Sequence, residues 1–257
     1  MLKTMMDVDV KQGLRIVRNR IEAACQKRKP ELQNVKANLV AVSKTKPAEM
    51  IVDCYDEGQR DFGENYVKEL SEKGINEEIL SKCKEIRWHF IGHLQNNKVN
   101  KLLKTPNLYM IETVDSVELA DLLNKNWQKI RTESDHRMKI MIQVNTSGEQ
   151  EKSGADPGTV NGFGTHVIEK CPNLELVGLM TIGRFGYNWR DEGAPPNPDF
   201  LGLIECRAAL CDHLGIDHVA MELSMGMSDD FEHAIDLGSG NVRVGSSIFG
   251  HRNYNDK

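Results

Sequence analysis

Short apolar runs alternate with longer amphipathic stretches along almost the whole chain, and this alternation is the feature that most constrains its fold. The runs are rich in Val, Ile, Leu and Met, as buried parallel strands are. We expect strands at 38–44, 61–65, 87–92, 108–114, 139–145, 176–183, 221–226 and 241–249. Helical patterns follow these runs, and strands that alternate with helices build parallel β/α units.

Eight such units in 257 residues fit one (β/α)8 TIM-type barrel, which we expect to occupy the chain, 1–257, as a single domain. An N-terminal helix over about 7–28 is expected before the first strand, because apolar residues recur there at helical intervals. The alternative is a doubly wound open sheet. No GxGxxG motif follows the first strand, so the dinucleotide-binding form of that fold has no support.

Composition narrows the class of protein further. The net charge is −5, so the chain lacks the basic excess of a nucleic-acid-binding surface. No apolar run has the length of a membrane span, and the first residues lack the apolar centre of a signal peptide. We therefore expect a cytoplasmic protein, with a mitochondrial fraction left open. The six cysteines form no CxxC pair and no zinc-finger spacing with histidine, so we expect neither a disulfide nor a bound metal.

In a barrel of this kind the functional residues lie where the strands end, because active sites form at the carboxyl ends of the strands. The first expected strand ends at Lys44, and the second ends at Glu64 and Asn65. The last two strands end in serines and glycines, at the place where such barrels often bind a phosphate group. Tight turns that need glycine would explain the same residues without a ligand.

Lys44 is the first candidate for chemistry. A lysine at a buried strand end loses hydration, which favours the neutral, nucleophilic amine that forms Schiff bases. The plainer alternative is an ammonium group that reaches solvent or pairs with Glu64. A lysine beside a phosphate site suits two classes of ligand. They are the sugar phosphates of Schiff-base aldolases and pyridoxal 5'-phosphate (PLP).

Arg243 helps to separate these two classes. An arginine two residues before Gly245 can donate to the ring nitrogen of PLP and keep it unprotonated, which weakens the ring as an electron sink. An ion pair with a carboxylate such as Asp236 is the plainer alternative. Two histidines are weaker candidates. His89 alternates with apolar residues, as a hydrogen-bonded core histidine does, and His93 fits a helix cap.

Eight segments occur in a fixed order between about Asn38 and Gly250, which is most of the chain. They are LVAVSKTKP, FGENYVKEL, WHFIGHLQNNK, ETVDSVELA, QVNTSGEQEKSG, GLMTIG, ELSMGMSDDFEHAI and GSGNVRVGSSIFG. The stretches AVSKTKP and LSMGMS are the most specific of them. Together these segments resemble the pyridoxal phosphate homeostasis protein family.

This resemblance implies a PLP site and a barrel similar to the N-terminal domain of alanine racemase. The residues that it implies for cofactor binding are Lys44, Asn65, Ser224, Met225, Arg243, Gly245 and Ser246. Lys44 would carry PLP as a Schiff base, and Lys46 would be a neighbouring basic residue. Arg243 would face the pyridine nitrogen and Asn65 would line the pocket. The segments around Ser224 and Gly245 would hold the phosphate.

The resemblance also implies a function in vitamin B6 homeostasis. The protein would bind PLP without catalytic turnover, with PLP-dependent apo-enzymes as candidate recipients. Alanine racemase has a second domain that supplies a tyrosine base, whereas this sequence ends seven residues after Gly250, so we expect a monomer without two-base racemisation. Two alternatives stay open. One is a PLP-dependent racemase or lyase for an unknown amino acid, with Lys44 as a base, and the other is a Schiff-base aldolase without cofactor.

Overall fold

The structure, a computed structural model, describes residues 8–131, 136–149, 151–184 and 186–250. Within these residues the strands form a closed parallel barrel in which each pairs with the next and β8 returns to β1. The strands are β1 (Asn38–Val42), β2 (Asp61–Glu64), β3 (Arg87–Phe90), β4 (Leu108–Val114), β5 (Met138–Gln143), β6 (Leu174–Met180), β7 (Glu222–Ser224) and β8 (Asn241–Val244). The expected TIM-type barrel is thereby confirmed.

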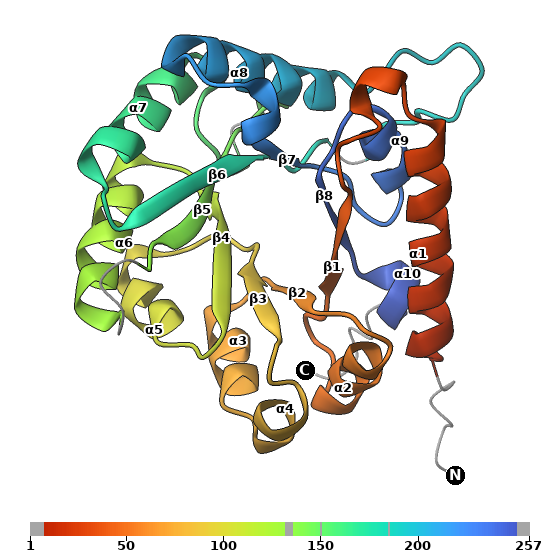
Figure 1. Ribbon diagram of the computed structural model, residues 1–257, viewed down its shortest axis with the longest axis vertical. Helices are drawn as coiled ribbons and strands as arrows, with labels where there is room; N and C mark the ends of the chain where they lie inside the picture. The colour runs from red at the N-terminus through yellow and green to blue at the C-terminus, as the bar shows by residue number, and fades with distance from the viewer. Residues whose placement is uncertain (1–7, 132–135, 150, 185, 251–257) are drawn as a thin grey trace.

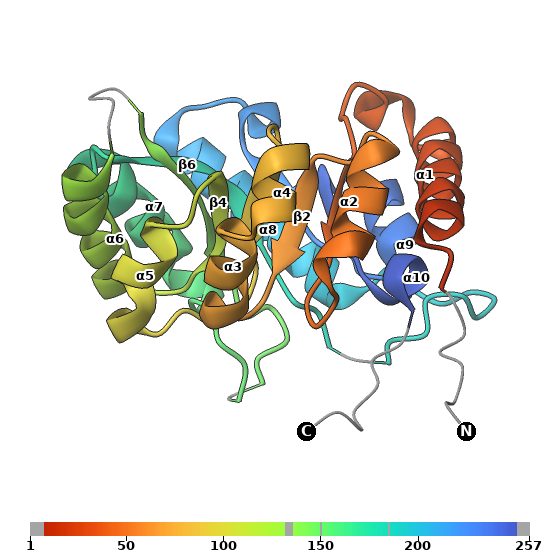
Figure 2. The same cartoon turned by 90° about the horizontal axis from the view of Figure 1, so that it is seen from below.

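Helices surround this barrel on its outside (Figure 1). They are α1 (Val10–Lys27), α2 (Ala48–Asp56), α3 (Val67–Gly74), α4 (Glu77–Lys82), α5 (Val99–Leu103), α6 (Val117–Ile130), α7 (Val160–Lys170), α8 (Pro198–Leu214), α9 (Phe231–Asp236) and α10 (Ser246–Phe249). Short 3-10 turns lie at Pro30–Leu32, Asn96–Lys98, Pro157–Thr159 and His218–Ala220. Figure 2 shows α5, α3, α4, α2 and α1 along one side of the ring, and successive helices pack together.

The strands send apolar side chains outward, to the layer between barrel and helices. In β3, Trp88 and Phe90 belong to this core, whereas the alternate residue His89 takes part in polar contacts. In β8, Val242 joins the core and the residues on either side of it are polar. Because side chains alternate between the two faces of a strand, the inside of this barrel is partly polar. A separate cluster of Met110, Met141 and Met180 lies apart from the main core.

The N-terminal helix α1 covers one side of the barrel on its outside. Its apolar face is buried and packs mainly against α2, α9 and α10. The buried residues of that face are Val10, Leu14, Val17, Ile21 and Ala24. A Cβ atom on Gly13 would lie 2.8 Å from the carbonyl oxygen of Ile248, so glycine permits the close approach of α1 to α10.

The last strand is shorter than the sequence predicts. The expectation of a strand over 241–249 is wrong after Val244, because Ser246–Phe249 form the short helix α10. The N–H groups of Ile248 and Phe249 both donate to the carbonyl of Gly245, at 3.0 and 2.9 Å. Apolar side chains at these positions are buried in a helix as readily as in a strand.

None of the helices in the described part of the chain has the length and apolarity that crossing a membrane requires.

Candidate functional site

A cavity of about 520 Å³ opens at the carboxyl ends of the strands. Its walls come from the ends of several strands, so residues far apart in the sequence meet there. The lining residues are Val42, Lys44, Lys46, Asn65, Ile91, Ile182, Met227, Ser228, Asp229, Arg243, Gly245, Ser246, Phe249 and Gly250. Of the residues expected from the sequence, Lys44, Asn65, Arg243, Gly245 and Ser246 lie in this lining.

The other two expected residues are not among those that line the cavity. Ser224 and Met225 are fully buried, and their polar groups are engaged inside the protein. The Ser224 hydroxyl donates to Glu112 at 2.6 Å and accepts from Arg243 at 2.5 Å. The Met225 N–H donates to the carbonyl of Asn241 at 3.2 Å. Neither residue therefore offers a free donor to a ligand in the cavity.

The segment after β7 reaches the cavity slightly later in the chain than the sequence suggests. Gly226 has a φ of +95°, a left-handed conformation that favours glycine, and the chain turns there. Ser228 follows and lines the cavity, and its hydroxyl accepts from the N–H of Gly245 at 3.2 Å. Ser228, Gly245 and Ser246 thus form one polar wall. Ser228 is not among the residues expected from the sequence, although it belongs to the same LSMGMS stretch as Ser224.

The backbone on both sides of Lys44 is held by carboxylates. Ser43 donates its hydroxyl to Glu64 at 2.7 Å, and the N–H of Thr45 donates to Glu69 at 2.6 Å. Thr45 has a φ of +63°, which a β-branched residue adopts only where its surroundings enforce it. The main chain that carries Lys44 is therefore fixed rather than freely mobile.

One buried ammonium group joins these contacts. Lys73 on α3 donates to the carbonyl of Ser43 and to the carboxylates of Glu64 and Glu69, each at 2.7 Å. The Lys73 side chain is 10% exposed and that of Glu64 is 0% exposed. Burial raises the pKa of Glu64, and the charge of Lys73 opposes that rise. The carboxylate that the sequence offered as a partner of Lys44 is thus bound by Lys73 and Ser43.

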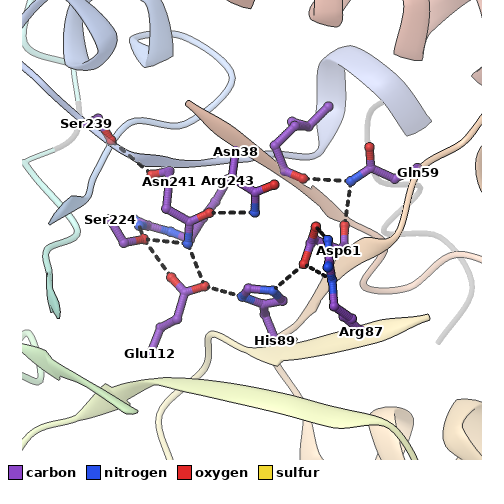
Figure 3. A network of polar contacts seen from close by, with 11 residues as sticks. Asn38, Gln59, Asp61, Arg87, His89, Glu112, Ser224, Ser239, Asn241 and Arg243 are labelled. Atoms are coloured by element: carbon purple, nitrogen blue, oxygen red, sulfur yellow. Dashed lines mark hydrogen bonds and ion pairs between the residues drawn. The ribbon is translucent and has the colours of Figure 1, made fainter. Parts of the chain in front are cut away.

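Arg243 belongs to a polar network inside the barrel (Figure 3). Its guanidinium group donates to the hydroxyl of Ser224 and, at 2.8 Å, to the carbonyl of Thr181. Glu112 accepts from Ser224 and also from Asn241, at 2.9 Å. Burial lowers the pKa of Arg243 and the charge of Glu112 opposes this, but a guanidinium group keeps its proton in proteins. The network therefore holds a charged Arg243 at the cavity wall.

The same network continues through His89 to the amino-terminal side of the barrel. His89 Nδ1 lies 2.7 Å from Glu112 Oε1, and His89 Nε2 lies 3.0 Å from Asp61 Oδ1. Asp61 in turn accepts from Arg87 at 2.8 and 2.5 Å. Burial alone would lower the pKa of His89, but its two carboxylate partners outweigh burial and raise that pKa to about 9. Charges thus alternate in sign from Arg243 to Arg87, and His89 is confirmed as a hydrogen-bonded core residue.

We expect this buried imidazolium to make the stability of the protein depend on pH. The pKa of His89 is about 9 in the folded state, above the ordinary 6.5, so its contribution is complete below about pH 6.5 and is lost as the pH rises through 9. A shift of this size corresponds to about 3 kcal/mol. Urea unfolding at both ends of this range measures the loss, and His89→Gln should remove most of it. An equal loss in the variant would contradict the assignment.

Asn65 carries a buried acceptor that the described residues leave unsatisfied. Its Oδ1 has no hydrogen-bond partner among them, and Asn65 lines the cavity. Gly92, after β3, lets the two chain segments come close, because a Cβ there would lie 1.9 Å from the Asn65 carbonyl oxygen. A buried acceptor at a cavity wall can take a hydrogen bond from a ligand that donates one.

Comparison with known proteins identifies the family. A family model described as the N-terminal domain of alanine racemase matches residues 16–253. The human pyridoxal phosphate homeostasis protein is 54% identical over 245 residues, which cover 95% of this chain and 87% of the human one. This chain belongs to the pyridoxal phosphate homeostasis protein family. The family resemblance stated from the sequence motifs is thereby confirmed.

Proteins from distant organisms are similar to this chain over most of its length. The Caenorhabditis elegans protein of that name is 42% identical, over 93% of this chain and 96% of its own. A solved structure of PipY from Synechococcus elongatus contains bound PLP. PipY is 27% identical, with a TM-score of 0.70 over 94% of this chain and all of its own.

Proposed function

We propose that this protein holds PLP as a Schiff base on Lys44 and takes part in PLP homeostasis as a carrier. The observation that carries the proposal is the meeting of Lys44, an unsatisfied acceptor on Asn65 and the buried cation of Arg243 around one cavity. The PLP bound by PipY, which has a similar fold, supports the same cofactor here.

The residues of the cavity fit the functional groups of PLP. The Lys44 amine would form an imine with the aldehyde, and water would leave. The unsatisfied Oδ1 of Asn65 suits the phenolic hydroxyl, which can donate to it. Arg243 suits the ring nitrogen, because its charge is held in place by Glu112 through Ser224.

The phosphate of PLP would lie against the wall formed by Ser228, Gly245 and Ser246. The hydroxyl groups of Ser228 and Ser246 lie in this lining and can donate to an anion. A side chain at Gly245 would come within 3.2 Å of the Val42 carbonyl oxygen, so this wall depends on a small residue. In this proposal Ser228 takes the role first expected of Ser224, and Ser224 supports Arg243 instead.

The groups around the cavity favour a carrier over an enzyme. A cation beside the ring nitrogen leaves PLP a weak electron sink, which disfavours the carbanion chemistry that the cofactor supplies in enzymes. Among the described lining residues, the titratable side chains are Lys44, Lys46, Asp229 and Arg243, without a Tyr, His or Cys. The described part of the lining therefore offers none of the side chains that usually serve as the second base of a racemase.

Two assays on the PLP-loaded protein test the function. Mixed with a PLP-dependent apo-enzyme, the loaded protein should restore that enzyme's activity as the cofactor transfers. Incubated with the common amino acids, it should form no racemised or cleaved product. Product formation by the wild type that Lys44→Ala lacks would instead establish the racemase or lyase alternative and overturn the carrier.

The proposal includes a cytoplasmic monomer. All six cysteines are free thiols, in keeping with a reducing compartment. Sedimentation of the purified full-length protein tests the monomer, because a dimer would roughly double the mass.

We expect Lys73 to position Lys44 without touching the cofactor. Lys73→Met removes the ammonium group that joins Ser43, Glu64 and Glu69, so the loop that carries Lys44 loses its anchor. Misplacing a reacting group by about 1 Å can slow a reaction by up to about a hundredfold. We expect the affinity for PLP to fall about tenfold or more. Titration with PLP, followed by its visible absorption, measures the change.

The matched control for this test lies on the same helix. Lys68→Met removes an ammonium group on a side chain that is 82% exposed and lies 3.9 Å from Glu72, so it should leave PLP binding unchanged. Lys73→Arg, which keeps the charge, should restore part of the affinity. Equal affinity in Lys73→Met and Lys68→Met would show that Lys73 does not position the loop.

A further inference from the structure

Away from the cavity, α6 and α7 bring together three side chains of the kinds that bind zinc. Asp121 lies on α6, His166 lies on α7, and Cys171 follows α7 directly. One ligand atom from each side chain, an oxygen, a nitrogen and a sulfur, lie within 4.8 Å of one another. In the part of the chain that the structure describes, this is the one such group of His, Cys, Asp or Glu side chains.

The distances are already close to those of a coordination shell. Cys171 Sγ lies 3.6 Å from Asp121 Oδ1, and His166 Nε2 lies 2.7 Å from the same oxygen. With zinc–ligand bonds of about 2.0–2.3 Å in a tetrahedron, two ligand atoms are about 3.3–3.6 Å apart. The sulfur–oxygen pair has this spacing. The nitrogen–oxygen pair needs to open by less than about 1 Å, which side-chain torsions can supply.

The three ligands also leave a path for an ion. The Asp121 side chain is 54% exposed and that of His166 is 29% exposed, while Cys171 is buried. The sulfur is therefore the inner ligand, and the oxygen and nitrogen lie toward solvent. An ion can enter from the solvent side and keep a water molecule as its fourth ligand.

The charges around the sulfur favour a divalent cation. The Cys171 thiol is buried and donates to the carboxylate of Asp121 at 3.6 Å, so a negative charge lies beside the sulfur. A metal ion between the two groups would attract both, and the thiol proton would leave to solvent as the metal–sulfur bond forms. Sulfur and imidazole ligands select zinc over magnesium or calcium.

We propose that Asp121, His166 and Cys171 bind one Zn²⁺ ion, with water as the fourth ligand. The ion would join α6 to the end of α7. The site is separate from the proposed PLP site, because none of the three residues lines that cavity. No metal was expected from the sequence, because the cysteines form no CxxC pair and no zinc-finger spacing with histidine. Asp121 lies 45 residues before His166, and such a separation gives no recognisable motif.

Cobalt is the probe for this site. The full-length protein, freed of metals with a chelator, is titrated with Co²⁺. We expect saturation at one ion per chain, with a near-ultraviolet band from thiolate-to-cobalt charge transfer that added Zn²⁺ removes. Zn²⁺ should also raise the midpoint of thermal unfolding, because a ligand that binds the folded state stabilises it. PLP binding to Lys44 should not change, which separates this test from the test of the cofactor site.

Variants assign the ligands. His166→Gln and Asp121→Asn alter solvent-accessible side chains and should keep the fold, and each should weaken Co²⁺ binding by at least about tenfold. Cys171→Ser should abolish the thiolate band. The controls are Cys206→Ser, at another buried thiol, and His213→Gln, at a histidine of α8 that contacts Thr165. Both controls should bind Co²⁺ as the wild type does.

Two results would overturn the zinc site. The first is the absence of a thiolate band at saturating Co²⁺. The second is a band that persists with unchanged affinity in both His166→Gln and Asp121→Asn. Either result would leave the three residues as a hydrogen-bonded cluster in which Asp121 pairs with His166.

Discussion

Lys44→Ala should abolish the visible absorption band that PLP gives on this protein, and PLP affinity should fall by about two orders of magnitude, or ~3 kcal/mol. The reason is that the variant keeps Arg243 and the polar wall of Ser228, Gly245 and Ser246 but loses the amine that we propose bonds to the cofactor. Lys46→Ala is the matched control, because Lys46 lies in the same loop and lines the same cavity. The control should keep the band.

Spectra of the three proteins decide between the hypotheses for the cavity. A band that persists in Lys44→Ala and disappears in Lys46→Ala would move the Schiff base to Lys46. The absence of a band in all three proteins would reject PLP as the ligand. The sugar-phosphate aldolase alternative would then remain, and borohydride trapping of a carbonyl substrate on the colourless protein would test it.

Glu112→Gln should destabilise the protein by about 3–5 kcal/mol, because it leaves buried cations without their shared partner. Glu112 lies between His89 and Ser224. Its negative charge offsets the lowering of the Arg243 pKa that burial causes. The amide keeps the shape of the side chain but not its charge. Urea unfolding at neutral pH measures the difference.

An exposed glutamate provides the control for this substitution. Glu205 lies on α8, is exposed, and should tolerate Glu205→Gln within about 0.5 kcal/mol. A Glu112→Gln protein as stable as this control would contradict the contribution of Glu112 to stability through its buried cationic partners. If only PLP affinity fell, Glu112 would act on Arg243 without contributing to stability.

The fold could be predicted from the sequence because buried parallel strands leave a local signal. The run LYMIETV matches β4 (Leu108–Val114) in both of its bounds. The signal fails at Ser246–Phe249, where buried apolar residues follow a glycine and form a helix instead of a strand. Short apolar runs do not distinguish these two states.

The cavity could be predicted only in part. Lys44, Asn65 and Arg243 lie at strand ends, so the barrel topology alone brings them together. Their supporting residues could not be foreseen. Lys73 lies in a charged helix whose sequence shows no sign that one lysine is buried, and Glu112 contacts residues more than a hundred positions away.

Ser224 shows a different limit of sequence reasoning. The motif LSMGMS contains two serines, and the sequence does not tell which of them reaches a ligand. In the structure the chain turns at Gly226, Ser228 lies in the cavity lining, and Ser224 remains buried inside the barrel. Similarly, the close approach of α7 to α8 explains Gly164, where a Cβ would lie 2.5 Å from Leu210.

Mapping the modified lysine tests the central claim most directly. The wild-type protein is mixed with an equimolar amount of PLP, reduced with borohydride and digested, and the peptides are analysed by mass spectrometry. We expect one pyridoxyl group per chain, on Lys44. A label on Lys46, or a label spread thinly over exposed lysines such as Lys68, would contradict the proposed site.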